Sequence, residues 1–449
     1  MAKTPVKVNL VTKPLSLAQT FAAVRKNVLS ILPEVATRQP IVSGRTGAAW
    51  HMLMDPKGLR RVLLENLDNY PKSNVTKNML RPAIGNSIFI VEGEEWRWQR
   101  RAAAPVFTPR NMKNLSPIMI EAAKRCVDRL TEAMQHPIDL NDEMVRTTFE
   151  IIADVTFSDE NGFDRKAVHK ALNDYMDSSA RVSVLDFFNL PDWVPRPNRI
   201  ISRSAMQNIH TLAEDVITAR EGAGASTPPD LLDLLFEGED PETKRKMDPI
   251  VIRDNLLAFI TAGHETTALT LSWALYLLAF DPEVQDKARQ EVRDVIGDGP
   301  LSIEHVERLT FVRQVIDETL RLYPPAPIVS RTAQQDDVLC GRKIRAGQTV
   351  LIPIYCLHRH KMLWEDPDAF RPERFGKGQK HDRFSYLPFI DGPRVCIGAS
   401  FALQEAVIIL ATLLQKFEFD AIPSKQPVPE MILTMRPTGG VWLKVRPAS

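Results

Sequence analysis

The chain has 449 residues, of which 44% are hydrophobic and 25% are charged, and its formal net charge is +1 at pH 7. This composition is typical of a globular protein that can bury a large core, and the balanced charge argues against nucleic acid as an obligate partner. The four cysteines, Cys126, Cys340, Cys356 and Cys396, form no CxxC pair, so we expect neither a disulfide framework nor a zinc site. A reducing cytoplasm is the simplest setting for such a chain.

The N-terminal segment has no feature of a membrane anchor. Residues 1–15 place three lysines among short apolar pieces, so they contain neither a signal-peptide core nor a span of about 20 apolar residues. We therefore expect a protein without a membrane anchor.

The first elements predicted along the chain are a strand over residues 48–54 and a helix that opens at Asp55-Pro56 and continues to Asn69. An irregular stretch is expected from Tyr70 to Glu92. The apolar side chains of this stretch need another group to pack against. They include Met79, Leu80, Ile84 and Phe89.

The next helical segment, over residues 94–101, places Trp96 and Arg100 four residues apart on one face. That pair fits a solvated helix with one aromatic side chain against the core, and it also fits a face that binds an anion. Further helices are predicted over residues 114–135 and 141–157. Residues 165–220 fit two amphipathic helices joined by an apolar connector over residues 182–199.

The long apolar stretch from Pro249 to Phe280 predicts a helix of roughly 45 Å. Its polar residues lie at mid-length, where burying them in the centre of a bilayer would be unfavourable. We therefore expect the central helix of a large protein rather than a membrane span.

The sequence Ala262-Gly263-His264-Glu265-Thr266-Thr267 lies in the middle of this helix. A glycine there costs about 1 kcal/mol relative to alanine, and threonine hydroxyls can bond backbone carbonyls one turn back. This local weakness favours a groove in the helix, although a buried helix with a few satisfied polar groups fits as well. A single helical histidine is more often packed than metal-bound, so we expect no metal at His264.

Glu318 and Arg321 lie three residues apart on a predicted helix that ends at Pro324-Pro325. Such a pair alone is most often a surface ion pair. Strands are predicted over residues 343–354 and 441–445.

A glycine-rich loop, residues 389–398, precedes the apolar run of residues 399–414 and brings Cys396 to the start of a predicted helix. The free N–H groups and positive dipole end of that helix are expected to lower the pKa of the thiol. Gly392 and Gly398 flank the sulfur, and we expect them to leave room for a flat ligand. The alternative is a buried free thiol that packs like a small apolar side chain.

The loop matches the pattern F-x-x-G-x-R-x-C-x-G and resembles the haem-binding loop of the cytochrome P450 family at every fixed position. The sequence at residues 262–267 resembles the family's A-G-x-[DE]-T-[TS] pattern. The E-x-x-R pair, Arg331 and the Pro372-Glu373-Arg374-Phe375 segment follow in the family's order, so the resemblance spans about residues 45 to 445.

This resemblance implies a mainly α fold with a minor β-rich lobe, and a haem between the long central helix and the cysteine loop. It implies one domain over residues 1–449. The small strand-rich lobe would come mainly from residues 1–75 and 326–360, and the large helical lobe from the rest.

The resemblance also assigns roles by position. Cys396 is expected to ligate the iron of haem b, and the other cofactor-binding residues are expected to be Trp96, Arg100, Ala262, Gly263, Arg331, Phe389, Arg394 and Gly398. Thr266 and Glu265 would be the alcohol and the acid that deliver protons to dioxygen. Glu318, Arg321 and Arg374 would form a buried clamp. The substrate pocket would be lined by Met79, Leu80, Ile84, Phe89, Ala258, Phe259, Ile328 and Val329.

The implied function is that of a haem-thiolate monooxygenase that hydroxylates an apolar small molecule such as a fatty acid, terpenoid or steroid. Two electrons from NAD(P)H would arrive through a ferredoxin or flavodoxin with its reductase, because the chain ends soon after the haem domain. Lys377, Lys380 and Arg383 would attract an acidic donor, although a solvated loop explains them as well. We expect a cytoplasmic monomer. The alternatives are a peroxide-dependent hydroxylase or isomerase of the same fold and, less favoured, a thiolate-haem sensor.

Overall fold

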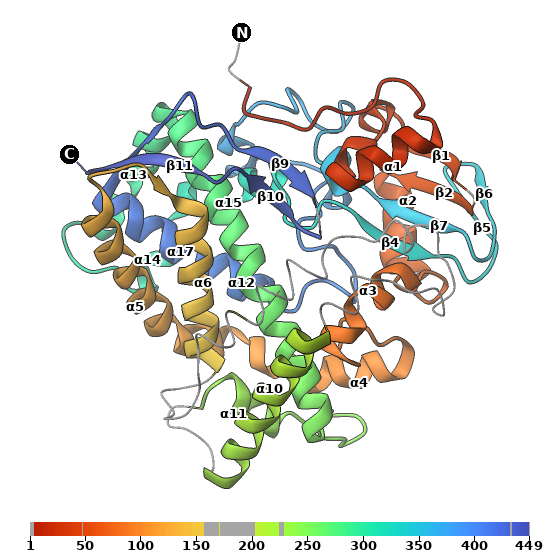
Figure 1. Ribbon diagram of the computed structural model, residues 1–449, viewed down its shortest axis with the longest axis horizontal. Coiled ribbons are helices and arrows are strands. Elements are labelled where there is room, and N and C mark those ends of the chain that lie inside the picture. Colours follow the sequence, from red (N-terminus) through yellow and green to blue (C-terminus); the bar gives the residue numbers. More distant parts are fainter. Residues whose placement is uncertain are drawn as a thin grey trace.

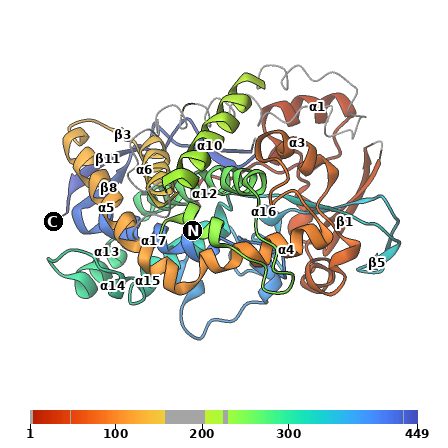
Figure 2. The same ribbon diagram turned by 90° about the horizontal axis from the view of Figure 1, so that it is seen from below.

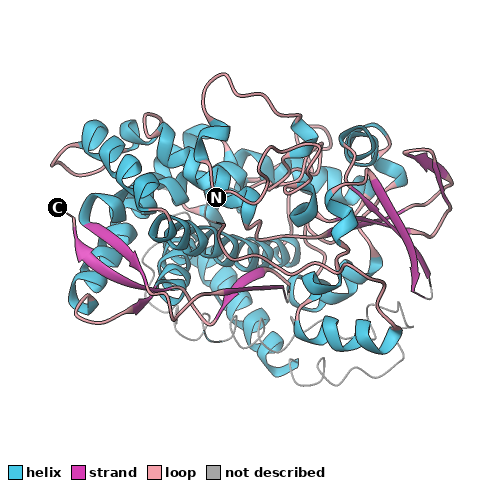
Figure 3. Ribbon diagram, turned by 90° about the horizontal axis from the view of Figure 1, so that it is seen from above, coloured by secondary structure: helices cyan, strands magenta, loops and turns pink. Residues whose placement is uncertain are grey.

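The computed structural model describes residues 4–46, 48–156, 170, 203–223, 229–431 and 433–448. Helices fill the centre of the molecule, and strands gather at two opposite ends (Figures 1 and 3). The α-helices are α1 (Leu17–Lys26), α2 (Pro56–Arg60), α3 (Asn74–Ile84), α4 (Gly93–Ala103), α5 (Pro109–Ala133), α6 (Leu140–Thr156), α10 (Arg203–Ala223), α11 (Leu231–Glu237), α12 (Pro249–Phe280), α13 (Pro282–Ile296), α14 (Ile303–Val306), α15 (Thr310–Leu322), α16 (Ile354–Leu357) and α17 (Ala399–Lys416). The strands are β1 (Ile41–Thr46), β2 (Ala48–Leu53), β3 (Ile138–Asp139), β4 (Val329–Thr332), β5 (Asp337–Leu339), β6 (Arg342–Ile344), β7 (Thr349–Ile352), β8 (Phe417–Ala421), β9 (Val428–Met431), β10 (Met435–Thr438) and β11 (Trp442–Pro447).

The predicted fold class is confirmed: the protein is mainly α with a minor β-rich part. Its largest sheet has the strand order β1-β2-β7-β4, in which β1 and β2 form an antiparallel hairpin and β7 runs parallel to β2. These strands come from the two ranges predicted for the small lobe. The remainder is not purely helical, however, because β3, β11 and β8 form a second sheet and β9 pairs with β10.

Helix α12 has the predicted bounds and runs through the centre of the molecule (Figure 1). The side chain of Asp248 caps its start by accepting a hydrogen bond from the backbone N–H of Val251 at 2.9 Å. Most of its length is buried, as expected for a helix that is apolar on all sides. It packs against α6, α15 and α17, and α10 packs across it (Figure 2).

One helix in the described part of the chain, α17, is long and apolar enough to cross a membrane, and 61% of it is buried inside the protein. It packs against α5, α12 and α15.

Three predictions of local structure were wrong. The stretch from Tyr70 to Glu92 is not irregular throughout, because α3 forms within it, capped by the Ser73 side chain, and tolerates Pro82. The helix predicted up to Asn69 is divided into α2, a π-helical turn over Arg61–Glu65 and a 3-10 turn over Leu67–Asn69. The strand predicted over residues 343–354 is interrupted by a turn between β6 and β7. Most of the helix pair predicted for residues 165–220, including its connector over residues 182–199, lies outside the described residues.

Candidate active site: a cavity between α12 and the Cys396 loop

A cavity of about 1250 Å³ lies between α12, α3, α4, β4 and the loop that carries Cys396. Most pockets that hold one drug-sized ligand have volumes of roughly 300–1000 Å³, so this cavity has room for a flat cofactor and a second small molecule. All eight residues predicted for the substrate pocket line it, namely Met79, Leu80, Ile84, Phe89, Ala258, Phe259, Ile328 and Val329.

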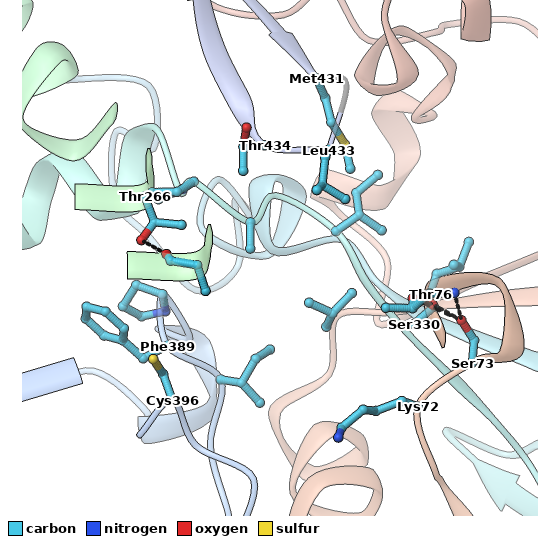
Figure 4. A pocket seen from close by; sticks show the side chains of 18 of the residues that line it. Lys72, Ser73, Thr76, Thr266, Ser330, Phe389, Cys396, Met431, Leu433 and Thr434 are labelled. Carbon is cyan, nitrogen blue, oxygen red and sulfur yellow. Dashed lines mark hydrogen bonds between the residues drawn. The ribbon is translucent and has the colours of Figure 1, made fainter. Parts of the chain in front are cut away.

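Cys396 lies on the cavity wall, and its side chain is exposed to the cavity (Figure 4). The turn that presents it is closed by two backbone hydrogen bonds, in which Cys396 N–H donates to Phe389 O and Val395 N–H donates to Gly392 O, both at 3.0 Å. Gly398, two residues later, is the N-cap of α17. The sequence therefore correctly places the cysteine just before a core helix.

The helix start lowers the pKa of the Cys396 thiol, as expected, but burial outweighs this contribution. Burial raises the pKa of Cys396, while the backbone N–H of Gly398 and the positive charge of Arg100 lower it. The desolvation cost of the thiolate exceeds these two stabilising contributions.

The two glycines beside the sulfur have different roles. Gly392 has a φ of +76°, and a Cβ there would lie 2.1 Å from the carbonyl oxygen of Leu63 in the π-helical turn. Packing against protein backbone therefore requires this glycine, which was not predicted. A Cβ on Gly398 would meet nothing closer than 3.8 Å, and Gly398 lines the cavity, as expected for a residue that leaves room for a ligand.

Two buried arginines, Arg331 on β4 and Arg394 in the cysteine loop, line another part of the cavity. Arg394 forms an ion pair with Glu92 and donates to Tyr70 O at 3.2 Å, whereas Arg331 donates to Ser330 O at 2.9 Å. Burial and, to a smaller extent, the neighbouring charge of Arg394 together lower the pKa of Arg331 to about 10, although Glu92 opposes the shift. Among the described residues, the Nε atoms of both arginines are buried without a hydrogen-bond partner.

Helix α4 brings Trp96 and Arg100 to the same cavity. Trp96 is buried, and the guanidinium of Arg394 lies over its ring at 5.4 Å. Arg100 is close enough to Cys396 for the charge of each to shift the pKa of the other.

Ala262, Gly263 and Thr266 line the cavity from α12. The Thr266 hydroxyl donates to Ala262 O at 2.8 Å, the bond to the preceding turn that was expected (Figure 4). The helix nevertheless stays α-helical through residues 262–267. His264 is buried and its Nδ1 bonds Ile260 O at 2.8 Å, and the described residues contain no cluster of metal-ligating side chains.

Glu265 does not reach Thr266 through any hydrogen bond of the described chain. Its Oε1 accepts from Thr434 at 2.9 Å and from Arg436 Nε at 2.7 Å, so its carboxylate is tied to β10. Its Oε2 is buried without a partner among the described residues.

The sequence model of the cytochrome P450 family matches residues 20–445. The chain belongs to the cytochrome P450 family. It is 33% identical over 403 residues to a cytokinin hydroxylase of Arabidopsis thaliana, and the matched region covers 88% of this chain and 78% of the relative. It is 30% identical over 414 residues to the putative cytochrome P450 132 of Mycobacterium bovis, with 88% and 87% covered. It is 32% identical over 384 residues to a bifunctional cytochrome P450/NADPH–P450 reductase of Bacillus cereus, with 82% of this chain and 35% of the relative covered.

This P450 is a monooxygenase, and the family uses haem b, molecular oxygen and NAD(P)H-derived electrons that arrive through a redox partner. The residues of the cavity fit a haem. The thiol of Cys396 faces the cavity, and the unpartnered Nε–H groups of Arg331 and Arg394 are donors that an anionic edge would satisfy.

The structure of this P450 also brings together the three charged residues predicted as a clamp. Glu318 is fully buried and accepts from Arg321 Nε at 2.7 Å and from Arg374 Nε at 3.3 Å. Arg321 also donates to the carbonyls of His358 and Pro367, each at 2.7 Å. These bonds join α15 to the segment that follows α16.

Several charged residues that line this P450's cavity or pair with its lining residues were not predicted. Lys72 lines the cavity and donates to Ile88 O at 3.0 Å, and burial lowers its pKa to about 7. Glu92 and Arg436 are the partners of Arg394 and Glu265. The sequence carries no local signal for these pairs, because Arg436 and Glu265 lie 171 residues apart.

Proposed function

We propose that this P450 hydroxylates an apolar small molecule, such as a fatty acid, terpenoid or steroid, that binds in the cavity against α12. The observation that supports this substrate class is the apolar wall made by the eight predicted pocket residues, which face the cavity from α3, its flanking loop, α12 and the start of β4. A wall of this kind binds by excluding water from apolar surface rather than by pairing charges.

We propose the following roles for the residues of the site. Cys396 ligates the haem iron, and the bound haem supplies the activation of dioxygen. Arg331, Arg394 and Arg100 hold the propionates, with Trp96 packed beside Arg394. Ala262, Gly263, Phe389 and Gly398 line the cavity and would enclose the bound haem.

Thr266 is proposed to hold a proton at its Oγ1 beside the oxygen site. Its hydroxyl is positioned by the carbonyl of Ala262, and it can accept a proton as it donates one. Glu265 is proposed as the acid of the pair. The ion pair with Arg436 would have to loosen for the carboxylate to turn toward Thr266.

We propose that the electron donor is a ferredoxin or flavodoxin with its reductase, and that the protein works as a cytoplasmic monomer with a single domain in two lobes. Lys377 and Lys380 are exposed before the cysteine loop, as an acidic donor requires. Arg383 contributes less charge than expected, because Asp391 pairs with it through two hydrogen bonds of 2.5 Å.

The test is a reconstitution with ferredoxin or flavodoxin and reductase, using apolar compounds selected by their shift of the haem from low to high spin. We expect NAD(P)H-dependent formation of an alcohol that carries one oxygen atom from ¹⁸O₂. Turnover with hydrogen peroxide, combined with no turnover with either electron donor, would replace this proposal with the peroxide-dependent alternative. A lack of spin shift with every apolar compound would contradict the substrate class.

A further inference from the structure

Three hydroxyl groups form a cluster on the cavity wall: Ser73 at the start of α3, Thr76 in its first turn, and Ser330 on β4. The Oγ atoms of Ser73 and Ser330 are 2.6 Å apart, and Thr76 Oγ1 lies 3.2 Å from Ser73 Oγ and 3.4 Å from Ser330 Oγ. In Figure 4 the cluster lies across the cavity from Cys396 and Thr266. We call these three residues the hydroxyl cluster.

Backbone contacts hold the hydroxyl cluster in place. Lys72 and Arg331, the neighbours of Ser73 and Ser330, form an antiparallel bridge, and Thr332 N–H donates to Pro71 O at 3.1 Å. Ser73 is 2% exposed. The cluster is therefore a preformed group of polar atoms within a largely apolar wall.

The cluster has hydrogen-bonding capacity that its own contacts do not use. Three hydroxyls carry three O–H donors, and the short contact between Ser73 and Ser330 uses one of them. The two other contacts, at 3.2 and 3.4 Å, are longer than the roughly 2.5–3.0 Å of a good O–H···O bond. The two remaining O–H groups thus have only long hydrogen bonds available inside the cluster, and each can form a shorter one to an oxygen of a ligand.

We infer that the hydroxyl cluster binds a neutral hydroxyl or carbonyl group at one end of an otherwise apolar substrate. The inference rests on the proposed function and adds a polar end to its substrate class. Hydroxyls can donate to a carbonyl oxygen, and they can both donate to and accept from an alcohol. A substrate held there presents its apolar end to the side of the cavity that contains Cys396 and Thr266.

A carboxylate fits this position less well than a neutral group. Three hydroxyls carry no charge, and burying a carboxylate without a cation is costly. Two cations are adjacent to the cluster in sequence. Lys72 donates its ammonium protons to Ile88 O at 3.0 Å and Val91 O at 3.2 Å, and Arg331 has the proposed role of holding a haem propionate.

The test is a titration of the haem-loaded enzyme with four compounds of equal chain length: an alkane, a primary alcohol, a methyl ketone and a carboxylate. Binding is monitored through the spin shift of the haem. We expect the alcohol and the ketone to bind about tenfold more tightly than the alkane, as one or two net hydrogen bonds provide. In Thr76→Val and in Ser330→Ala, this preference should fall to about twofold while the dissociation constant of the alkane stays the same. Ser73 is left intact because it caps α3.

Ser43→Ala is the matched control, because Ser43 also lines the cavity but its hydroxyl bonds His51 Nδ1 at 2.8 Å. This variant should keep the full preference for the alcohol. A second readout is the oxidised carbon, which should lie far from the polar group in the wild type and spread along the chain in Thr76→Val.

Three outcomes would overturn the inference: equal binding of alkane and alcohol by the wild type, tightest binding of the carboxylate, or a parallel loss of alkane and alcohol binding in the variants. The last would assign the cluster a purely structural role. Failure of the proposed function is separate, because it would appear as no spin shift with any member of the series.

Discussion

Arg331 is a buried arginine whose guanidinium donates a hydrogen bond to a backbone carbonyl rather than to a carboxylate. Burial and the charge of Arg394 both lower its pKa, which means that the surrounding protein does not fully stabilise the positive charge. The residue is therefore arranged for an anion that comes from outside the chain. A haem propionate satisfies this requirement in both charge and hydrogen bonding.

Replacing Arg331 by methionine should weaken haem retention. Loss of one charged hydrogen-bonding partner is worth about 1.5–3 kcal/mol, so haem transfer to an acceptor protein should be about tenfold faster or more. Arg313→Met is the control, since Arg313 is an exposed arginine that pairs with Asp317 and does not line the cavity. An unchanged rate of haem loss in Arg331→Met would rule out the propionate role.

Thr266 holds its hydroxyl on the carbonyl of Ala262, and the proposed function gives it a proton to pass on. In Thr266→Ala we expect more NADPH to be diverted to hydrogen peroxide, whereas Thr266→Ser should restore most of the coupling. The measurement is the ratio of peroxide to NADPH consumed. Coupling that is unchanged in Thr266→Ala contradicts the role in proton delivery.

At the scale of the elements, α15 is fixed by a buried ion pair rather than by apolar packing alone. Glu318 and Arg321 are both fully buried, and Arg374 adds a second positive charge to the same carboxylate. Removal of one partner leaves the others buried without compensation, which is usually more costly than the pair is favourable.

Glu318→Gln should therefore destabilise the fold by about 3–5 kcal/mol, as measured by denaturant unfolding of the haem-loaded protein. The matched control is Glu121→Gln on α5, because Glu121 pairs with Lys124 at the same three-residue spacing but in solvent. The control should have little effect. If both variants lose the same small amount of stability, the buried clamp is not a stabilising element.

Local patterns could be predicted from the sequence wherever neighbouring residues decide the structure. The bounds of α12 follow from its cap, its leading proline and its continuous apolar run. Helix α3 could not be predicted in this way, because Pro82 inside it is typical of a loop.

The charges around the cavity could be predicted only in part. Arg331 and Arg394 stand out through the family patterns, but their surroundings depend on Glu92 and Lys72, which match no pattern. The net direction of the Cys396 pKa shift could not be predicted for a related reason: the helix start, which lowers the pKa, is visible in the sequence, whereas the burial that outweighs it is a property of the folded chain.

At the scale of the whole molecule, α12 and α17 meet in the core, and a carboxylic acid lies between them. Glu405 on α17 is 1% exposed, with Thr267 of α12 as its hydrogen-bonding neighbour. Burial raises the pKa of Glu405 to about 8, so the folded protein favours the neutral acid.

The pH dependence of stability follows from this raised pKa. In the unfolded chain, Glu405 ionises near its ordinary pKa of 4.5. The neutral acid therefore makes its full contribution to the stability of the fold below that pH, and this contribution is lost as the pH rises toward 8. Between about pH 4.5 and pH 7 the loss is on the order of 3 kcal/mol. The free energy of unfolding of Glu405→Gln, measured in denaturant, should therefore change less with pH than that of the wild type.

The control for this prediction is Glu132→Gln, at an exposed position on α5. It should keep the wild-type pH dependence. If the free energy of unfolding of Glu405→Gln has the same slope against pH as that of the wild type, the carboxyl group is already ionised in the folded protein.

The cavity wall is built from both ends of the chain, and this has a consequence for biosynthesis. Trp96 and Arg100 belong to the first quarter of the sequence, whereas Cys396 and Thr434 belong to its last eighth. Cys396 is translated after Trp96, Arg100 and all of α12. Capture of the prosthetic group is thus expected to follow translation, once the C-terminal hairpin of β9 and β10 has docked on α12.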